Sequence, residues 1–110
     1  MSNPGPGLVV LYRWRLLPGS ETSFTEAWSR ITESLRSRSG SLGSRLHRGS
    51  DGIWYGYAQW PSDAVRQRAF AQPPDPEAAA QMRAAVAESF PEVVLEPVSD
   101  FLFLPHAIGT

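Results

Sequence analysis

The chain contains no cysteine and no lysine among its 110 residues. Without cysteine it has no disulfide bond, no thiolate nucleophile and no cysteine-ligated metal site. Without lysine it lacks the ε-amino group that Schiff-base catalysis and the phosphate-binding P-loop need. All ten basic residues are arginines. These absences exclude several catalytic classes before any motif is considered.

An excess of positive charge and a long apolar run are also missing. The net charge is -1, whereas a protein that binds a phosphate backbone needs a basic surface. No apolar stretch approaches the roughly 20 residues of a membrane-spanning helix. Residues 1–7 lack the basic and apolar segments of a signal peptide. We therefore expect a cytoplasmic protein with neither a nucleic-acid nor a membrane partner.

The length and the 42% hydrophobic content fit one globular domain. We place it at residues 8–104, after a flexible N-terminus at 1–7 and before a C-terminal tail at 105–110. A single core of this size buries only part of the chain's surface, so association between copies is a natural way to bury more.

Strand-forming residues predict four strands. The first three lie at 8–17, 42–48 and 53–60, and the last lies within 93–104, where Pro97 favours an edge strand or a bulge. The segment GSDG, between the second and third strands, suits a tight hairpin. Even positions of the first strand are all apolar or aromatic, which predicts that this face is buried.

Helical spacing follows the first strand. Phe24, Trp28, Ile31 and Leu35 recur as one stripe of an amphipathic helix. Ser20 or Ser23 can cap its start, and Ser23 is spaced from Glu26 as in a capping box. Gly40 supplies the stop.

The segment after the third strand predicts a broken helical crossover. Ser62 can cap a short helix at 63–71, which Gln-Pro-Pro ends. Asp75 followed by Pro76 and an acid is a strong start for another helix. We expect that helix to bury four side chains, Ala79, Met82, Val86 and Phe90.

The element order is therefore β-α-β-β-α-β, which predicts an α+β ferredoxin-like fold. Its four-stranded antiparallel sheet carries the helices on one face. Neither face of the strand at 53–60 is a plain solvent face. We expect the helix-free faces to pair in a homodimer, which buries four side chains only on association: Val9, Leu11, Tyr55 and Tyr57.

Three segments in order carry a resemblance to a known family. They are a strand running through Pro-Gly into a helix (RLLPGSETSF), Gly-Ser-Leu before the second strand (SGSLGSRLHR), and a third strand ending in Trp before a helix start (YAQWPSDAV). This pattern resembles the antibiotic biosynthesis monooxygenases over residues 8–104. The resemblance implies dimeric α+β barrels with a pocket between the helices and the sheet.

The resemblance also implies a function and a site. Trp60 matches a tryptophan that lines the pocket in several members, and Tyr12 occupies the first-strand position where haem-degrading members carry a catalytic asparagine. We therefore take Tyr12 and Trp60 as candidate catalytic residues. The candidate substrate-binding residues are the surrounding aromatics, Trp14, Trp28, Phe24 and Trp54. The implied activity is cofactor-independent oxygenation of a polycyclic phenol, with neither a cofactor nor a metal.

Haem degradation does not fit this sequence. The only asparagine is Asn3, and the helix that would carry a proximal histidine offers Arg66, Gln67 and Arg68 instead. His47 is expected on a strand at the dimer face or rim, and His106 in the tail.

No carboxylate pair, Ser/His/Asp set or metal cluster stands out, and the general base stays unassigned. Arg13 and Arg15 are expected at the interface rather than on substrate. Two alternatives remain open: a non-catalytic dimer that binds an aromatic metabolite, and an isomerase or cyclase on the same fold.

Overall fold

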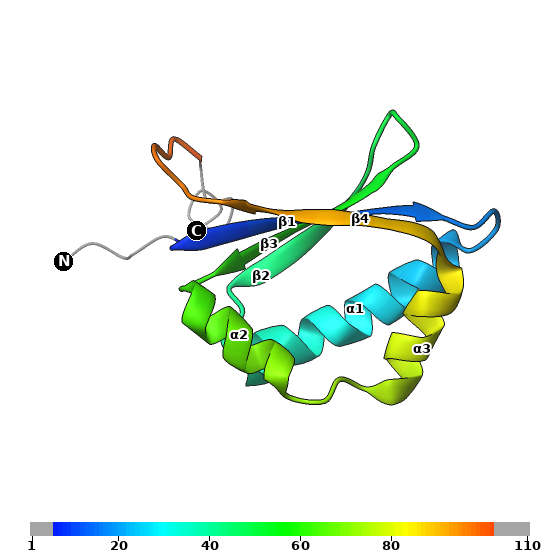
Figure 1. Ribbon diagram of the computed structural model, residues 1–110, viewed down its shortest axis with the longest axis horizontal. Helices are drawn as coiled ribbons and strands as arrows, with labels where there is room; N and C mark the ends of the chain where they lie inside the picture. Colours follow the sequence, from blue (N-terminus) through cyan, green and yellow to red (C-terminus); the bar gives the residue numbers. More distant parts are fainter. Residues whose placement is uncertain (1–5, 103–110) are drawn as a thin grey trace, which may run out of the picture.

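The computed structural model describes residues 6–102 and contains one antiparallel sheet with a helical layer (Figure 1). Its elements, in chain order, are β1 (Leu8–Leu16), α1 (Glu21–Arg38), β2 (Gly43–Arg48), β3 (Trp54–Trp60), α2 (Asp63–Ala71), α3 (Pro76–Ala85) and β4 (Val86–Leu95). The strand order is β2-β3-β1-β4. Helices α1, α2 and α3 lie on one side of the sheet (Figure 1). The predicted α+β ferredoxin-like fold is confirmed.

The β2–β3 hairpin closes as the sequence predicts. The Gly49 amide donates to the Ile53 carbonyl at 2.7 Å, and the Asp51 carboxylate accepts from the Ile53 amide at 2.9 Å. Gly52 has φ +85°, a left-handed conformation that costs glycine little. The turn therefore fixes how β2 and β3 pair.

Helix α1 begins earlier than the capping-box prediction allows. The helix starts at Glu21, Ser20 occupies the cap position without a side-chain hydrogen bond to the helix, and Ser23 already lies inside the first turn. The Ser23–Glu26 capping box is therefore wrong. The helix ends at Arg38, two residues before Gly40, whose φ is +86°.

The broken crossover between β3 and β4 follows its capping residues. The Ser62 hydroxyl accepts a hydrogen bond from the Val65 amide at the start of α2. At the start of α3, the Asp75 carboxylate accepts from the amides of Glu77 and Ala78. Between the two helices lies the Gln-Pro-Pro segment, so the predicted break is confirmed.

The prediction that α3 extends to Phe90 is wrong. Helix α3 ends at Ala85, and β4 begins at Val86, directly opposite Leu16 of β1. Pairing with β1 overrides the helical spacing of Val86 and Phe90, since it satisfies the backbone groups of a whole strand. The last strand therefore lies at 86–95 rather than within 93–104, and Pro97 follows it.

Strand β4 contains a proline where it bulges. Leu11 pairs with Val93 and Arg13 with Phe90, so Pro91 and Glu92 together lie opposite the single residue Tyr12. Proline cannot donate to a ladder and is tolerated at bulges on edge strands, and β4 is an edge strand. The bulge brings Glu92 beside the position of Tyr12.

The core lies between the sheet and the helices. Phe24, Ala27, Val10 and Trp60 are buried there. The Phe24 ring packs edge-on against Trp14 at a centroid distance of 5.0 Å and against Trp54 at 6.1 Å. Of the predicted helix stripe Phe24 is fully buried, whereas Trp28, Ile31 and Leu35 are half-buried.

The helix-free face carries the side chains expected there, with one correction. Leu11 pairs with Tyr57 and Val93, and Arg13 pairs with Tyr55, so these residues share that face. Leu11, Tyr55 and Tyr57 are half-buried in the single chain. Val9 is 4% exposed without any partner, because it is a small side chain on a central strand between Gln59 and Leu95. The prediction that association is needed to bury Val9 is wrong.

None of the helices described between residues 6 and 102 is long and apolar enough to span a bilayer.

The core predicts unequal costs for two aromatic truncations on α1. Phe24→Ala should lower the free energy of unfolding by about 3 to 5 kcal/mol, because Phe24 is completely buried. Trp28→Ala should cost about 1 to 2 kcal/mol despite removing more atoms, because Trp28 is half-buried. Denaturant melts of both variants test this order, and an equal or larger loss for Trp28→Ala would contradict it.

Candidate functional site

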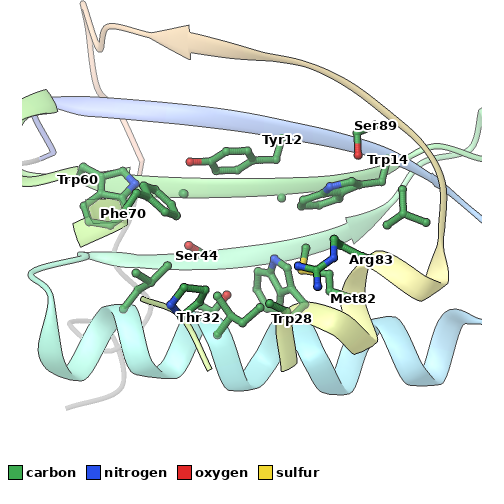
Figure 2. A pocket seen from close by; sticks show the side chains of 17 residues that line it. Tyr12, Trp14, Trp28, Thr32, Ser44, Trp60, Phe70, Met82, Arg83 and Ser89 are labelled. Carbon is green, nitrogen blue, oxygen red and sulfur yellow. The ribbon is translucent and has the colours of Figure 1, made fainter. Parts of the chain in front are cut away.

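A cavity of about 620 Å³ lies between the helix-covered face of the sheet and the helices (Figure 2). Strands contribute its floor and helices α1 and α3 much of its roof. Its lining is chiefly apolar and aromatic: Tyr12, Trp14, Trp28, Ile31, Thr32, Leu35, Ser44, Gly56, Ala58, Trp60, Phe70, Pro74, Ala79, Met82, Arg83, Val86 and Ser89. A volume of this size suits a drug-sized ligand, for which pockets span about 300–1,000 Å³.

The floor is flat because a glycine lies beneath an indole. Gly56 of β3 pairs with Tyr12 of β1. A Cβ on Gly56 would come within 3.0 Å of the Trp14 ring atom Cη2, so the lack of a side chain lets this indole approach the sheet. Tyr12 and Trp14 stack with an interplanar angle of 14°. The floor therefore suits a planar ligand.

Trp60 closes one end of the cavity. It is 1% exposed, and its ring lies 5.8 Å from that of Phe70 on α2. The indole Nε1–H is buried and has no hydrogen-bond partner within residues 6–102. Figure 2 shows the Tyr12 hydroxyl pointing toward this Trp60–Phe70 end, while Arg83 and Ser89 lie at the other end.

The Tyr12 hydroxyl is held by an arginine on α2. Arg66 Nε donates to Tyr12 Oη at 3.3 Å, and the guanidinium also contacts the Glu92 carboxylate and, at 3.5 Å, Asp63. The Arg66 side chain is only 13% exposed. This Tyr12–Arg66–Glu92 cluster joins β1, α2 and the bulge of β4.

The cluster determines whether the Tyr12 hydroxyl acts as a hydrogen-bond donor or as an acceptor toward a ligand. Arginine has donors and no acceptor, so the Tyr12 oxygen must accept from Arg66 and its own proton must point elsewhere. The structure gives that proton no acceptor within residues 6–102. Burial raises the pKa of Tyr12 above its ordinary value, although the hydrogen bond and charge of Arg66 act in the opposite direction. Tyr12 is therefore a protonated donor at neutral pH.

A second, smaller cavity adjoins this cluster. It has a volume of about 330 Å³ and is lined by Tyr12, Arg66, Gln67, Phe70 and Glu92. Tyr12 and Phe70 line both cavities, so they form the partition between an apolar chamber and a charged one.

The structure places the candidate site residues in two groups. Tyr12, Trp60, Trp14 and Trp28 line the larger cavity. Phe24 and Trp54 do not line it; Phe24 packs between Trp54 and the Trp14 ring, behind the cavity wall. The roles assigned to all six stay predictions.

Sequence reasoning missed several polar residues of the two cavities. The sequence shows Arg66 only as a residue of the helix that lacks a histidine, and no pattern in it predicts that Glu92 lies in a bulge opposite Tyr12. Arg83 and Ser44 line the larger cavity from α3 and β2, with no motif to mark them. The pairing of elements far apart in the chain brings these residues together.

No described histidine lines either cavity, and no metal site is found among the described residues. His47 is exposed on β2 and pairs with Tyr55, on the helix-free face; His106 lies outside the described residues. Within residues 6–102 no three His, Asp or Glu side chains gather as a metal site would require.

The fold is shared with solved monooxygenases. SnoaB from Streptomyces nogalater, described as a cofactor-independent oxygenase, superposes with a TM-score of 0.72 at 20% identity, over 86% of this chain and 95% of SnoaB. The chain has the fold of antibiotic biosynthesis monooxygenases. A protein from Caulobacter crescentus provisionally assigned to these monooxygenases gives a TM-score of 0.73 at 16% identity, over 86% of this chain and 92% of its own. Rv0793 from Mycobacterium tuberculosis gives 0.71 at 16% identity, over 86% and 98%.

The chain resembles known proteins in its fold but not detectably in its sequence. No family model matches the chain. No curated protein matches it either. Identities of 16 to 20% to these structures establish the fold, and thereby confirm the resemblance at that level, while the reaction has to be argued from the cavity itself.

The geometry predicts that Arg66→Met raises the pKa of Tyr12 further. Arg66 favours the phenolate through its charge and its hydrogen bond, so its loss removes the two effects that lower the pKa. Ultraviolet titration measures the change, with Tyr12→Phe identifying the transition. Arg68→Met is the matched control, because Arg68 lies on the same helix and lines neither cavity. An unchanged or lower pKa in Arg66→Met would contradict the assignment.

Proposed function

We propose that the chain is a cofactor-independent monooxygenase that binds a planar phenol or related polycyclic molecule in the larger cavity. The observation that carries the proposal is the Tyr12 hydroxyl at the edge of a flat aromatic chamber, a donor without an acceptor among residues 6–102. The fold shared with SnoaB, described as a cofactor-independent oxygenase, supports it.

The proposed chemistry takes its electrons from the substrate. A phenol releases its proton to water. The resulting anion, with charge shared between oxygen and ring carbon, passes electrons to dioxygen and forms a carbon–oxygen bond. Oxygenation of a ring CH₂ to a carbonyl uses both atoms of dioxygen, one in the product and one in water. The Tyr12 O–H stabilises the substrate oxyanion, which favours ionisation of the phenol. The indoles of Trp14, Trp28 and Trp60 hold the ring system and exclude water.

One observation favours the non-catalytic alternative. Among the described residues that line the larger cavity, none is Asp, Glu or His, the usual general bases. A dimeric protein that binds an aromatic metabolite would need only the flat walls and the Tyr12 donor. Turnover of a polycyclic phenol without oxygen consumption would instead indicate an isomerase or cyclase.

Oxygen uptake with a panel of phenols and anthrones tests the function. Wild-type protein should oxidise at least one of them with oxygen as the only co-substrate. Tyr12→Phe should lower kcat by about 10²-fold, the loss typical of removing one oxyanion donor. Trp60→Phe should keep the fold while weakening substrate binding. No turnover by wild-type protein would favour the binding-protein alternative, and unchanged turnover in both variants would reject the site assignments.

We also propose that two copies pair through the helix-free faces of their sheets. That face carries half-buried Leu11, Tyr55 and Tyr57 beside Val93 and Leu95, which are 38% and 40% exposed. The helices lie on the opposite side of the sheet (Figure 1). An apolar face of this kind is typical of an interface, and a specific interface buries about 800 Å² per partner.

Light scattering at micromolar concentration should give twice the mass of the chain. Leu11→Asp should give the single-chain mass, because it places a charge in the centre of the proposed interface. Glu21→Asp on α1, an exposed residue away from that face, should leave the dimer intact. A stable single-chain mass for wild-type protein would contradict the proposed dimer.

A further inference from the structure

The end of the larger cavity opposite Trp60 holds a group of hydrogen-bond donors. Among the described residues that line this cavity, Arg83 on α3 is the one that carries a charge. Figure 2 shows Arg83, Trp28 and Ser89 of β4 toward the same end of the cavity, with the Trp28 indole nitrogen facing the sheet. The Trp28 Nε1 atom would lie 3.5 Å from a Cβ on Gly56, so this donor sits directly over the cavity floor.

Arg83 and the Trp28 indole have no protein acceptor within the part of the chain that the structure describes. The carboxylates that flank Arg83 in sequence are engaged elsewhere, since Glu77 lies near Arg30 and Glu88 pairs with Arg15 at 2.7 Å. Within residues 6–102 no ion pair or hydrogen bond engages the guanidinium of Arg83 or the indole N–H of Trp28. An arginine fork and a neighbouring N–H match an acceptor that carries negative charge.

The two ends of the cavity therefore differ in the group they can recognise. The Tyr12 hydroxyl offers one neutral donor near Trp60, whereas the Arg83 end offers a cation where the cavity reaches solvent, since Arg83 is exposed. The walls between are apolar. A ligand that satisfies both ends is a flat ring system with a phenolic or carbonyl oxygen at one end and an anion at the other.

We infer that the ligand of this cavity is a planar aromatic carboxylate whose carboxylate pairs with Arg83. The inference rests on the proposed function only in placing an aromatic molecule between the indoles. It adds the substrate class and the orientation: the carboxylate faces solvent beside α3, and the reacting ring lies toward Tyr12. Arg83 is thus a substrate-binding residue that sets specificity rather than a catalytic one.

Binding of two matched probes tests this inference. Anthracene carboxylate and anthracene carboxamide have nearly the same shape and differ in charge, and quenching of tryptophan fluorescence reports both. Wild-type protein should bind the carboxylate about tenfold more tightly than the carboxamide. This factor is at the lower end of the range for a hydrogen bond between charged groups, because Arg83 is exposed to solvent. The preference should shrink as salt is added.

Arg83→Gln should bring the two affinities within about twofold of each other while carboxamide binding stays at the wild-type value. Arg83→Lys should retain part of the preference, since it keeps the charge and loses the planar fork. Arg68→Gln, which removes an equal charge from α2 outside both cavities, should keep the tenfold preference.

Three results would overturn the inference. They are no preference for the carboxylate in wild-type protein, a preference that persists in Arg83→Gln, and an equal loss of affinity for both probes in that variant. The assay needs no turnover, so the two proposals fail separately. Carboxylate preference without oxygen uptake would reject the oxygenase alone, and oxygen uptake without the preference would reject the Arg83 assignment alone.

Discussion

The packing of Phe24 between two tryptophans of the sheet holds the rest of the structure in place. Phe24 is completely buried, and its edge meets the rings of Trp14 and Trp54 on neighbouring strands. This contact fixes one part of α1 against β1 and β3 and supports Trp14 from behind. Further along α1, Trp28, Ile31 and Leu35 line the cavity between the helix and the sheet. The same face of α1 therefore packs into the core at Phe24 and lines the cavity from Trp28 onward.

The irregular parts of the fold bring charged groups to the smaller cavity and apolar side chains to the larger one. The bulge at Pro91 and Glu92 interrupts the pairing of β4 opposite Tyr12, and Glu92 holds the Arg66 guanidinium that donates to the phenol. The break between α2 and α3 places Phe70 on one side of the gap and Pro74 on the other, and both line the chamber. A continuous helix and a regular edge strand would have given a more uniform apolar interface. Local departures from regular structure thus have a direct chemical consequence.

The cluster of Tyr12, Arg66 and Glu92 also shows how a neutral donor is maintained beside a charge. Burial opposes ionisation of Tyr12, while Arg66 favours it. Glu92 pairs with the Arg66 guanidinium, and its negative charge disfavours the phenolate. Because burial is the largest effect, the pKa is raised and the phenol keeps its proton at neutral pH. Its capacity as a donor is lost only when the pH rises through that raised value.

The sequence by itself determined the order of strands and helices and which residues share a face of the first three strands. Alternation in β1 and β3 placed Tyr12, Trp14 and Trp60 on the helix side and Leu11, Tyr55 and Tyr57 on the other, because side chains of a strand alternate strictly. Caps at Ser62 and Asp75 set the helix starts for an equally local reason.

Only the tertiary structure decided where α3 gives way to β4, since Val86 to Phe90 continue a helical pattern until pairing with β1 overrides it. It likewise decided that Arg66 and Glu92 meet at Tyr12, and that Arg83 reaches the cavity of Trp28. These residues lie far apart in the chain, and the energy that selects their contacts comes from packing and strand pairing between distant segments, which leave no periodic pattern in the sequence.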